Sequence, residues 1–279
     1  MRAMVVGAGG FLGSRLTRHL VQGRSEVHGT WFRRRDRLPE GLASDIHIGE
    51  IEAAKLPSPD AVFVCAAHIP YGALGTPSAE LTEANVRLVE RCLSWFPGAR
   101  IVLASSAAAY GAAPSPRSES TTPTAPDAYG LSKLGGEMVV RNHPSFAIVR
   151  LTSLFGPGMT APVFLRAIVN DARDRKRIRI LGDGKRTQDY LFIDDAARLM
   201  SAAAASTTNG VFLGASGITV SNQRAARAVA SEIPGTEIEF DGEDATPSTS
   251  YDPSWTFRQL RFSPAVDFEE GVGRMIRGC

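Results

Sequence analysis

The chain has 279 residues, of which 43% are hydrophobic and 22% charged, and its formal net charge is +2. This composition is typical of a globular protein with a sizeable core, and the absence of a basic stripe argues against a nucleic-acid partner. No apolar run approaches 18 residues and no signal peptide is recognisable, so we expect a cytoplasmic protein without a membrane partner. Cys65, Cys92 and Cys279 are widely separated, so we expect neither a metal site nor disulfides.

Short apolar runs alternate with amphipathic stretches along the first half of the chain. The runs at residues 3–6, 26–32, 61–66, 100–104 and 146–151 predict buried parallel strands, and residues 11–22, 78–96 and 127–142 predict helices between them. This order predicts an α/β fold with a Rossmann-type doubly wound parallel sheet. We expect a dinucleotide-binding domain over residues 1–155 and a smaller substrate-binding lobe over residues 156–279. The two are expected to interleave, because residues 211–213 could be a strand of either part.

A glycine-rich turn follows the first predicted strand and opens the first predicted helix. Gly7 would allow the tight turn, Gly10 would let a pyrophosphate approach backbone amides at the helix N-terminus, and Gly13 would let helix and sheet pack closely. Phe11 and Leu12 complete the expected cofactor turn. A glycine cluster can also be a simple loop, but the order of strand, turn and helix favours a dinucleotide site.

The end of the second predicted strand bears on the choice of cofactor. NAD sites place Asp or Glu there for the ribose hydroxyls, whereas this chain has Trp31 followed by Arg33 and Arg34. An arginine there can pair with a 2′-phosphate, which favours NADP over NAD, unless the cluster is only a solvated loop. A further strand is expected between residues 32 and 48, and Glu50 and Ile51, which follow it, are expected at the adenine edge.

Tyr129 and Lys133 lie four residues apart in the predicted helix 127–142. Positions i and i+4 share a helix face, so the ammonium can lie near the phenol. A nearby cation lowers the pKa of tyrosine from about 10 and makes proton exchange with a substrate oxygen feasible. Solvated helices show the same spacing by chance, but behind a glycine turn it favours hydride transfer. Residues 112–126, just before this helix, are either a functional loop or a flexible surface excursion.

Together these features resemble the extended short-chain dehydrogenase/reductase superfamily and, within it, the NAD-dependent epimerase/dehydratase family acting on nucleotide sugars. Beyond the motifs above, the resemblance is carried by residues 65–67, by Asn85, and by the segments 103–111, 150–158 and 181–195. It implies a nucleoside diphosphate sugar as the small-molecule substrate. It also implies a homodimer formed through the helices at 78–96 and 127–142.

The resemblance implies roles for individual residues. Ser106 would hydrogen-bond the reacting sugar oxygen, Tyr129 would exchange its proton, and Lys133 would hold the nicotinamide ribose. Further residues implied at the cofactor are Cys65, Ala66, Ala67, Asn85, Ser105 and Leu154, and those implied at the substrate are His68, Ala107, Ser153 and Arg186. Structural alternatives remain for several of them. Ser105 and Ser106 could only cap the strand, Asn85 could only cap its helix, and Ser153 and Leu154 could close the sheet edge. His68 is implied at the sugar pocket together with Tyr71, but it could also be structural.

Two departures from the family pattern narrow the expected reaction. Dehydratases of the family carry an acidic pair after the catalytic hydroxyl, where this chain has Ala107 and Ala108, so elimination is disfavoured. The family's diphosphate-binding arginine is replaced by Gln188. Either Arg186 or Lys185 substitutes for it, or the substrate is not a typical nucleoside diphosphate sugar.

Three functions are compatible with these patterns. The favoured one is an NADP(H)-dependent ketoreductase of a nucleotide-activated (deoxy)sugar, because NADP preference suits net reduction. The alternative is a nucleotide-sugar epimerase with tightly bound NAD. The third, a non-catalytic dinucleotide-binding regulator, is disfavoured because a sensor does not need the proton-transfer groups Ser106, Tyr129 and Lys133.

Overall fold

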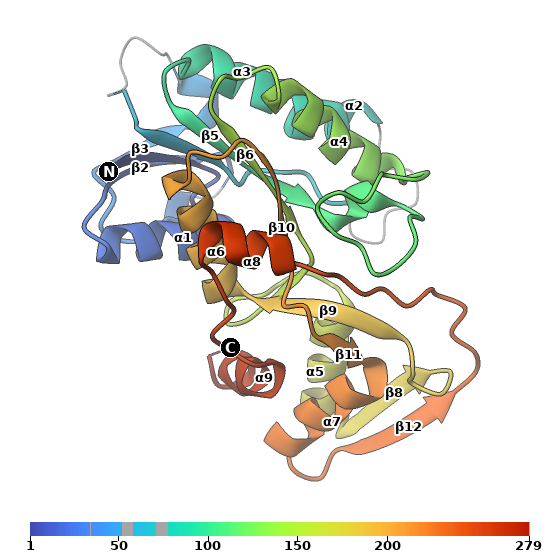
Figure 1. The fold of residues 1–279 in the computed structure, drawn as a ribbon. Coiled ribbons are helices and arrows are strands. Elements are labelled where there is room, and N and C mark those ends of the chain that lie inside the picture. Colours follow the sequence, from blue (N-terminus) through green and yellow to red (C-terminus); the bar gives the residue numbers. More distant parts are fainter. Residues whose placement is uncertain (34, 52–57, 71–77, 279) are drawn as a thin grey trace.

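The computed structural model describes residues 1–33, 35–51, 58–70 and 78–278 (Figure 1). Arg34, Tyr71 and Cys279, which figured in the sequence-based expectations, lie outside these described residues.

A seven-stranded parallel sheet forms the centre of the larger part of the molecule. Its order is β10-β6-β5-β4-β1-β2-β3. The strands are β1 (Arg2–Val6), β2 (Glu26–Trp31), β3 (Ser44–His47), β4 (Ala61–Val64), β5 (Arg100–Ser106), β6 (Phe146–Leu151) and β10 (Gly210–Gly214). The strand order reverses between β1 and β4, which is where open α/β sheets bind ligands beyond the carboxyl ends of their strands. The predicted doubly wound fold is confirmed.

Helices cover both faces of this sheet, as Figure 1 shows. One face carries α1 (Phe11–Gln22) and α6 (Ile193–Ala205), and the other carries α2 (Ser78–Thr82), α3 (Leu88–Trp95) and α4 (Ala128–Val140). Alternate residues of β1 belong to the two cores: Ala3 and Val5 to one, Met4 and Val6 to the other. Because both faces are buried, the central strands β1, β4, β5 and β6 are largely apolar, which is why they were recognisable as continuous runs.

The predicted helix 78–96 is interrupted by a π-helical turn. This turn, Glu83–Arg87, joins α2 to α3 and contains the buried Asn85. A π-turn widens the helix by one residue, and such turns occur frequently at functional sites. Hydrophobic periodicity alone could not show this interruption.

The second, smaller part is built from residues of the C-terminal half. It contains the sheet β11-β9-β7 with β7 (Ser153–Phe155), β9 (Thr187–Phe192) and β11 (Thr219–Ser221), and the pair β12-β8 with β8 (Arg177–Leu181) and β12 (Glu237–Asp241). Its helices are α5 (Phe164–Arg175), α7 (Asn222–Glu232) and α9 (Phe268–Arg277). Between these elements the chain returns to the large sheet, where β10 pairs with β6. The division at residues 155 and 156 stays a prediction.

A connecting segment joins the smaller part to the loop that precedes α4. Residues 242–253 lead from β12 to α8 (Ser254–Leu260) (Figure 1). Along this path Arg117 and Tyr251 form a β-bridge, in which the Arg117 amide donates to the Ser250 carbonyl at 2.9 Å. Glu119 accepts hydrogen bonds from the backbone amide and hydroxyl of Thr256 at the start of α8. The loop at 112–126 is therefore tied down by hydrogen bonds rather than free on the surface.

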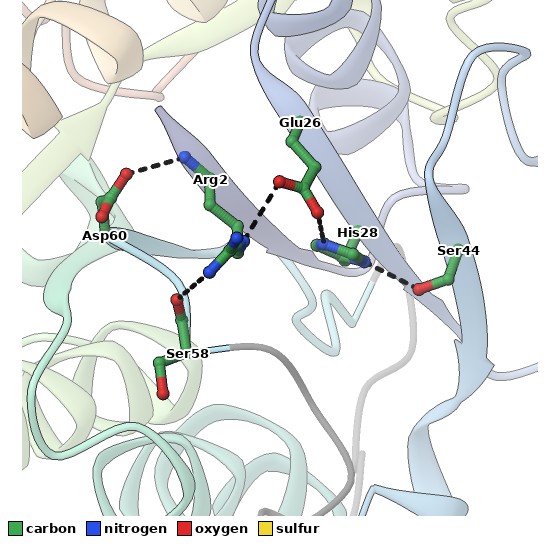
Figure 2. A network of polar contacts seen from close by, with 6 residues as sticks. All are labelled: Arg2, Glu26, His28, Ser44, Ser58 and Asp60. Atoms are coloured by element: carbon green, nitrogen blue, oxygen red, sulfur yellow. Dashed lines mark hydrogen bonds and ion pairs between the residues drawn. The ribbon is translucent and has the colours of Figure 1, made fainter.

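Polar side chains join the amino ends of the strands, at the edge opposite the glycine turn (Figure 2). The Arg2 Nε donates to Glu26 Oε2 at 3.1 Å, and the Arg2 amide donates to Asp60 Oδ2 at 2.7 Å. His28 lies between Glu26 Oε1 at 3.2 Å and the Ser44 hydroxyl at 2.8 Å. This network links β1, β2, β3 and the start of β4.

The described part of the chain lacks two kinds of feature. None of its helices combines the length and apolarity needed to span a bilayer. Nor do three His, Cys, Asp or Glu side chains there come together as a metal site would require.

Candidate active site

The glycine turn at the carboxyl end of β1 is tight enough to exclude side chains. Gly7 has φ +90°, and a Cβ added to it would lie 2.7 Å from the Ala66 nitrogen. A Cβ on Gly13 would lie 2.1 Å from the Gly7 carbonyl oxygen. Gly10 is the N-cap of α1 and brings no side chain of its own to the first-turn amides, where Phe11 and Leu12 begin the helix. These features suit a pyrophosphate held by backbone N–H groups, so the residues fit a dinucleotide.

Near the end of β2 lies a carboxylate that belongs to the neighbouring strand. Asp45 on β3 accepts from the Trp31 indole at 3.1 Å and from Arg35 at 2.8 and 3.1 Å. The Arg35 guanidinium holds the pKa of Asp45 below its usual range. Phe32 is 61% exposed, and the Arg33 guanidinium lies 5.4 Å from its ring centroid. Sequence reasoning missed Asp45 because it lies 14 residues after Trp31 and meets it only across the sheet.

Glu50 and Ile51 lie where the sequence placed them, after β3. Glu50 is exposed at the end of a short 3-10 helix, Ile48–Glu50, and Ile51 is buried. An adenine contact at this place would therefore use the exposed Glu50 side chain or the backbone, and it stays a prediction.

The loop after β4 contacts the glycine turn and is fixed by Asn85. The amides of Cys65 and Ala66 both donate to the Val6 carbonyl at 2.9 Å, and Ala67 beyond them is exposed. The Asn85 side chain accepts from the His68 amide at 2.9 Å and donates to the His68 carbonyl at 3.0 Å. It also donates to the hydroxyl of Ser132, a residue of α4, at 2.9 Å. Asn85 thus bridges the loop and α4.

The backbone of His68 is anchored, but its imidazole is not enclosed. The side chain is 38% exposed, and its Nε2 lies 3.9 Å from the Glu80 carboxylate. A contact with substrate stays a prediction, and the structural alternative is met by the backbone bonds to Asn85.

Ser106 ends β5, and α4, which carries Tyr129, packs on the 3-10 helix that follows Ser106. The Ser106 hydroxyl accepts from the Ala108 amide at 3.1 Å and caps the 3-10 helix Ala107–Tyr110. Gly130, next to Tyr129, packs so closely on this 3-10 helix that an added Cβ would lie 2.3 Å from the Ala108 oxygen. Ser106 is partly exposed, as Tyr129 is. Capping therefore leaves the Ser106 hydroxyl accessible for a second hydrogen bond.

Lys133 is buried beneath Tyr129, one helical turn further along α4. It is 3% exposed, and its Nζ donates to the Ala104 carbonyl at 2.7 Å. Burial removes water from the ammonium and lowers its pKa to about 8, while the Glu137 carboxylate acts in the opposite direction. Burial also raises the pKa of the Cys65 thiol to about 12, so this thiol is neutral. Lys133 can thus carry a charge near neutral pH and release it in mildly alkaline solution.

A buried ion pair lies one further turn along the same helix. Glu137 accepts from the Arg150 Nε at 2.9 Å and from its terminal nitrogen at 2.7 Å, and their side chains are 2% and 4% exposed. The Ser105 hydroxyl donates to the same carboxylate at 2.6 Å. The Arg150 guanidinium lies 4.5 Å from the centroid of the Tyr110 ring. Because the Ser105 hydroxyl faces Glu137, the expected contact of Ser105 with nicotinamide stays a prediction.

Sequence reasoning missed Glu137 and Arg150, although two signals were present. Glu137 continues the four-residue spacing from Lys133, and Arg150 is a charge inside an otherwise apolar run. A charge in a buried strand requires a partner, and Glu137 provides it.

Asp189 connects the end of β6 to the smaller part of the molecule. Its buried carboxylate accepts from the Thr152 hydroxyl at 2.9 Å and from the amides of Ser216 and Gly217, both at 2.8 Å. Thr152 is followed by β7, in which Ser153 is exposed and Leu154 half-buried. Both residues are therefore placed beyond the carboxyl end of β6, and their contacts with cofactor or substrate stay predictions.

Arg186 lines a cavity of about 490 Å³ between residues 181–186 and 242–248. Its side chain is 25% exposed and lies 3.9 Å from Asp244, and its Nε is buried without a hydrogen-bond partner among the described residues. Gln188, in contrast, donates to the Tyr190 hydroxyl at 3.2 Å. Lys185 is exposed and paired with Asp183. Of the two candidate cations, Arg186 is the one with an unsatisfied donor.

Comparison with known proteins identifies the family of this chain. The model of the NAD dependent epimerase/dehydratase family matches residues 3–213. The uncharacterized UDP-glucose epimerase YtcB of Bacillus subtilis (strain 168) is 26% identical over 229 residues, which are 72% of this chain and 72% of that protein. A dTDP-L-rhamnose 4-epimerase of Burkholderia thailandensis is 28% identical over 173 residues, which are 57% of this chain and 48% of that protein.

Solved structures share the fold over the whole chain. MoeE5 in complex with UDP-glucose and NAD has a TM-score of 0.85 at 24% identity, covering 100% of this chain and 98% of that one. The UDP-glucuronic acid 4-epimerase from Bacillus cereus in complex with NAD has a TM-score of 0.85 at 21% identity, with the same coverage. The match to the family model extends over most of the chain and includes the glycine turn, Ser106, Tyr129 and Lys133. This protein therefore belongs to the NAD dependent epimerase/dehydratase family of enzymes.

Proposed function

We propose that this protein is a nucleotide-sugar epimerase that uses bound NAD. The observation that carries the proposal is that α4, which bears Tyr129, packs at the end of β5, which bears Ser106, with Lys133 buried against the same strand. Ala107 and Ala108 stand where a second acid-base pair would. Epimerisation by oxidation and re-reduction needs one proton-transfer group at the reacting oxygen, whereas elimination needs more. The named activities of the two curated relatives, both epimerases, support the same choice.

The chain's residues have complementary parts in this reaction. A bound dinucleotide would supply the hydride acceptor and donor at the sugar carbon. Tyr129 would accept the hydroxyl proton when the carbon is oxidised and return it when the carbon is reduced from the opposite face. The Ser106 hydroxyl would donate to the reacting oxygen, and the charge on Lys133 would favour the phenolate of Tyr129.

The NADP(H)-dependent ketoreductase is the second candidate, and one observation favours it. The end of β2 has no carboxylate of its own, Asp45 is held by Arg35 and Trp31, and the Arg33 guanidinium is exposed beside Phe32. Such a cation suits a 2′-phosphate. The comparisons do not support the NADP preference, because the two solved structures described above hold NAD, so the epimerase becomes the leading proposal.

The cofactor and the reaction can be tested together. Purified protein is denatured, any released dinucleotide is identified by chromatography, and the protein is titrated with NADH and NADPH while its tryptophan fluorescence is followed. The proposal expects NAD to co-purify and UDP-glucose or a related sugar nucleotide to be interconverted without added cofactor. Tighter NADPH binding, with stoichiometric NADPH oxidation by a keto-sugar, would establish the ketoreductase instead. Dinucleotide binding without turnover of any sugar nucleotide would point to the regulator.

The proton-transfer role of Tyr129 has its own test. In Tyr129→Phe we expect turnover to fall about 10²- to 10⁴-fold, because general acid-base catalysis contributes on that order, with NADH binding unchanged. Tyr190→Phe is the matched control, since it removes a hydroxyl that is buried in the smaller part and bonded to Gln188. Turnover of Tyr129→Phe at the parent rate would defeat the mechanism.

We further propose that the substrate is a nucleoside diphosphate sugar and that the enzyme is a homodimer in the cytoplasm. The UDP-sugars named with the solved structures support the substrate class, and Arg186 is the residue we propose for the diphosphate. Leu131 and Met138, which are 56% and 70% exposed on α4, support an interface on that helix. Free thiols at Cys65 and Cys92 suit a reducing compartment.

A further inference from the structure

We propose that Glu137 is a positioning residue of the proton-transfer site: held by Arg150 and Ser105, it sets the charge state of Lys133 and fixes α4 against the strand that carries Ser106. The catalytic part of this inference rests on the proposed function. The part that concerns Lys133 is a property of the unliganded protein.

The side chains of α4 attach this helix to β5 at two places. Tyr129, Lys133 and Glu137 lie on one face of α4 in three successive turns, since residues four apart share a face. Lys133 donates to the Ala104 carbonyl and Glu137 accepts from Ser105, so α4 is attached to two consecutive residues of β5. The next residue of that strand is Ser106. The two attachments therefore determine where the phenol of Tyr129 lies relative to the Ser106 hydroxyl.

The surroundings of Lys133 contain a charge of opposite sign. The groups that face Lys133 come from four elements: Tyr129 and Glu137 on α4, the neutral Cys65 thiol after β4, the Ala104 carbonyl on β5, and Arg150 on β6 behind Glu137. Among these described groups Glu137 is the one carboxylate, and it favours the charged form of Lys133. Arg150 limits this effect, because its guanidinium occupies both oxygens of the carboxylate.

Stability alone does not account for the buried pair of Glu137 and Arg150. A buried ion pair contributes little net stability, because desolvation offsets the attraction, and apolar residues of similar volume often serve equally well. Glu137 and Arg150 are nevertheless both nearly fully buried and held bidentately. A role for this pair in tuning the neighbouring ammonium explains the charges, which packing alone does not.

The balance between the two charges gives a test that separates tuning from structural damage. In Glu137→Gln the anion is lost and Arg150 is left unpaired, so the proton-release midpoint of Lys133 should fall by about one pH unit or more. In Arg150→Met the carboxylate is left without its arginine, so the midpoint should rise. Both variants lose hydrogen bonds of the same buried ion pair, yet they should move the Lys133 midpoint in opposite directions.

The measurement is direct because the chain has four lysines, Lys55, Lys133, Lys176 and Lys185. The side-chain NMR signals of 13C-lysine-labelled protein are followed from pH 6 to 11, and the Lys133 signal is assigned by its absence from Lys133→Met. Asp189→Asn is the matched control, since it alters another buried carboxylate and should leave the Lys133 midpoint unchanged. Glu137→Asp retains the charge and should return the midpoint toward the parent value.

If a single variant does not fold, the double variant Glu137→Gln/Arg150→Met supplies the answer, because it leaves no bare charge. Its Lys133 midpoint should lie below that of the parent, since the carboxylate acts on Lys133 more strongly than the arginine behind it. An unchanged midpoint there, or shifts of the same sign in the two single variants, would overturn the proposal.

A kinetic measurement tests whether Glu137 affects catalysis. With the sugar nucleotide that the parent converts, the alkaline limb of the pH–rate profile should move to lower pH in Glu137→Gln, with KM unchanged. A failure of the proposed function would remove the substrate but leave the NMR result intact. Conversely, parent-like titration of Lys133 in an active Glu137→Gln would defeat this inference alone.

Discussion

An arginine is paired with a glutamate near each end of the parallel sheet. Arg2 and Glu26 meet at the amino ends of the strands, where their side chains are 42% and 47% exposed (Figure 2). Arg150 and Glu137 meet near the carboxyl ends, where their side chains are 4% and 2% exposed. Water screens the first pair and is excluded from the second. Losing one partner should therefore cost little stability at the exposed pair and much at the buried pair. The reacting groups lie beside the buried pair.

The largest effect is expected when the buried pair is broken. In Arg150→Met the buried Glu137 loses both donor nitrogens of the arginine and keeps only the hydrogen bond from the Ser105 hydroxyl. Breaking such a buried pair costs about 3–5 kcal/mol of unfolding free energy. Urea denaturation at pH 7 measures this. A loss no greater than that of Arg2→Met would show that burial does not distinguish the two ends.

A smaller effect is expected at the glycine turn, also at the carboxyl edge. In Gly13→Ala the new methyl would meet the Gly7 carbonyl oxygen at 2.1 Å, so we expect a loss of about 1–3 kcal/mol from overpacking and weaker dinucleotide binding. Gly98→Ala is the control, because nothing lies within 4 Å of its added methyl. Denaturation and NADH titration report the two effects, and parent-like NADH binding by Gly13→Ala would contradict a pyrophosphate at this turn.

A pH-dependent effect of comparable size is expected from Lys133. Burial lowers its pKa from 10.5 to about 8, so between these values the unfolded chain binds more protons than the folded protein. The free energy of unfolding should therefore rise with pH in this window relative to that of Lys133→Met. Denaturation of both proteins at pH 7, 8, 9 and 10 measures the difference, and a constant difference would show that Lys133 titrates normally.

The smallest effect is expected at the exposed end. Glu26→Gln removes the partner of Arg2 and His28. In the parent protein the pKa of Glu26 lies below its usual value, chiefly because of the hydrogen bond from Arg2. Because this carboxylate remains solvated, we expect no measurable shift of the urea midpoint at pH 7. A shift comparable to that of Arg150→Met would mean that the amino-end network stabilises the sheet as a unit.

The parts of the molecule that could be predicted are those encoded locally. Fully buried strands such as β1 and β4 were recognisable because both faces require apolar residues, and the turn at Gly7 was recognisable because helix and strand meet there at close range. The Tyr129 and Lys133 spacing is also local, since four residues span one helical turn. These signals were sufficient to predict the fold and to propose the centre of the candidate site.

The parts that could not be predicted depend on pairs distant in sequence. Arg150 meets Glu137 across 13 residues, Asp45 meets Trp31 across 14, and Asp189 meets Ser216 across 27. Such pairs form only after strands and helices have packed.

The sequence by itself determined the doubly wound sheet, the glycine turn and the helix that carries Tyr129 and Lys133, because each depends on periodicity or spacing within one or two elements. Only the tertiary structure decided that β10 joins the large sheet, that Ser105 faces Glu137, and that Lys133 is buried on β5. Burial and charge balance arise from several strands at once. The environment of the proton-transfer residues therefore depends on the whole fold rather than on any single segment.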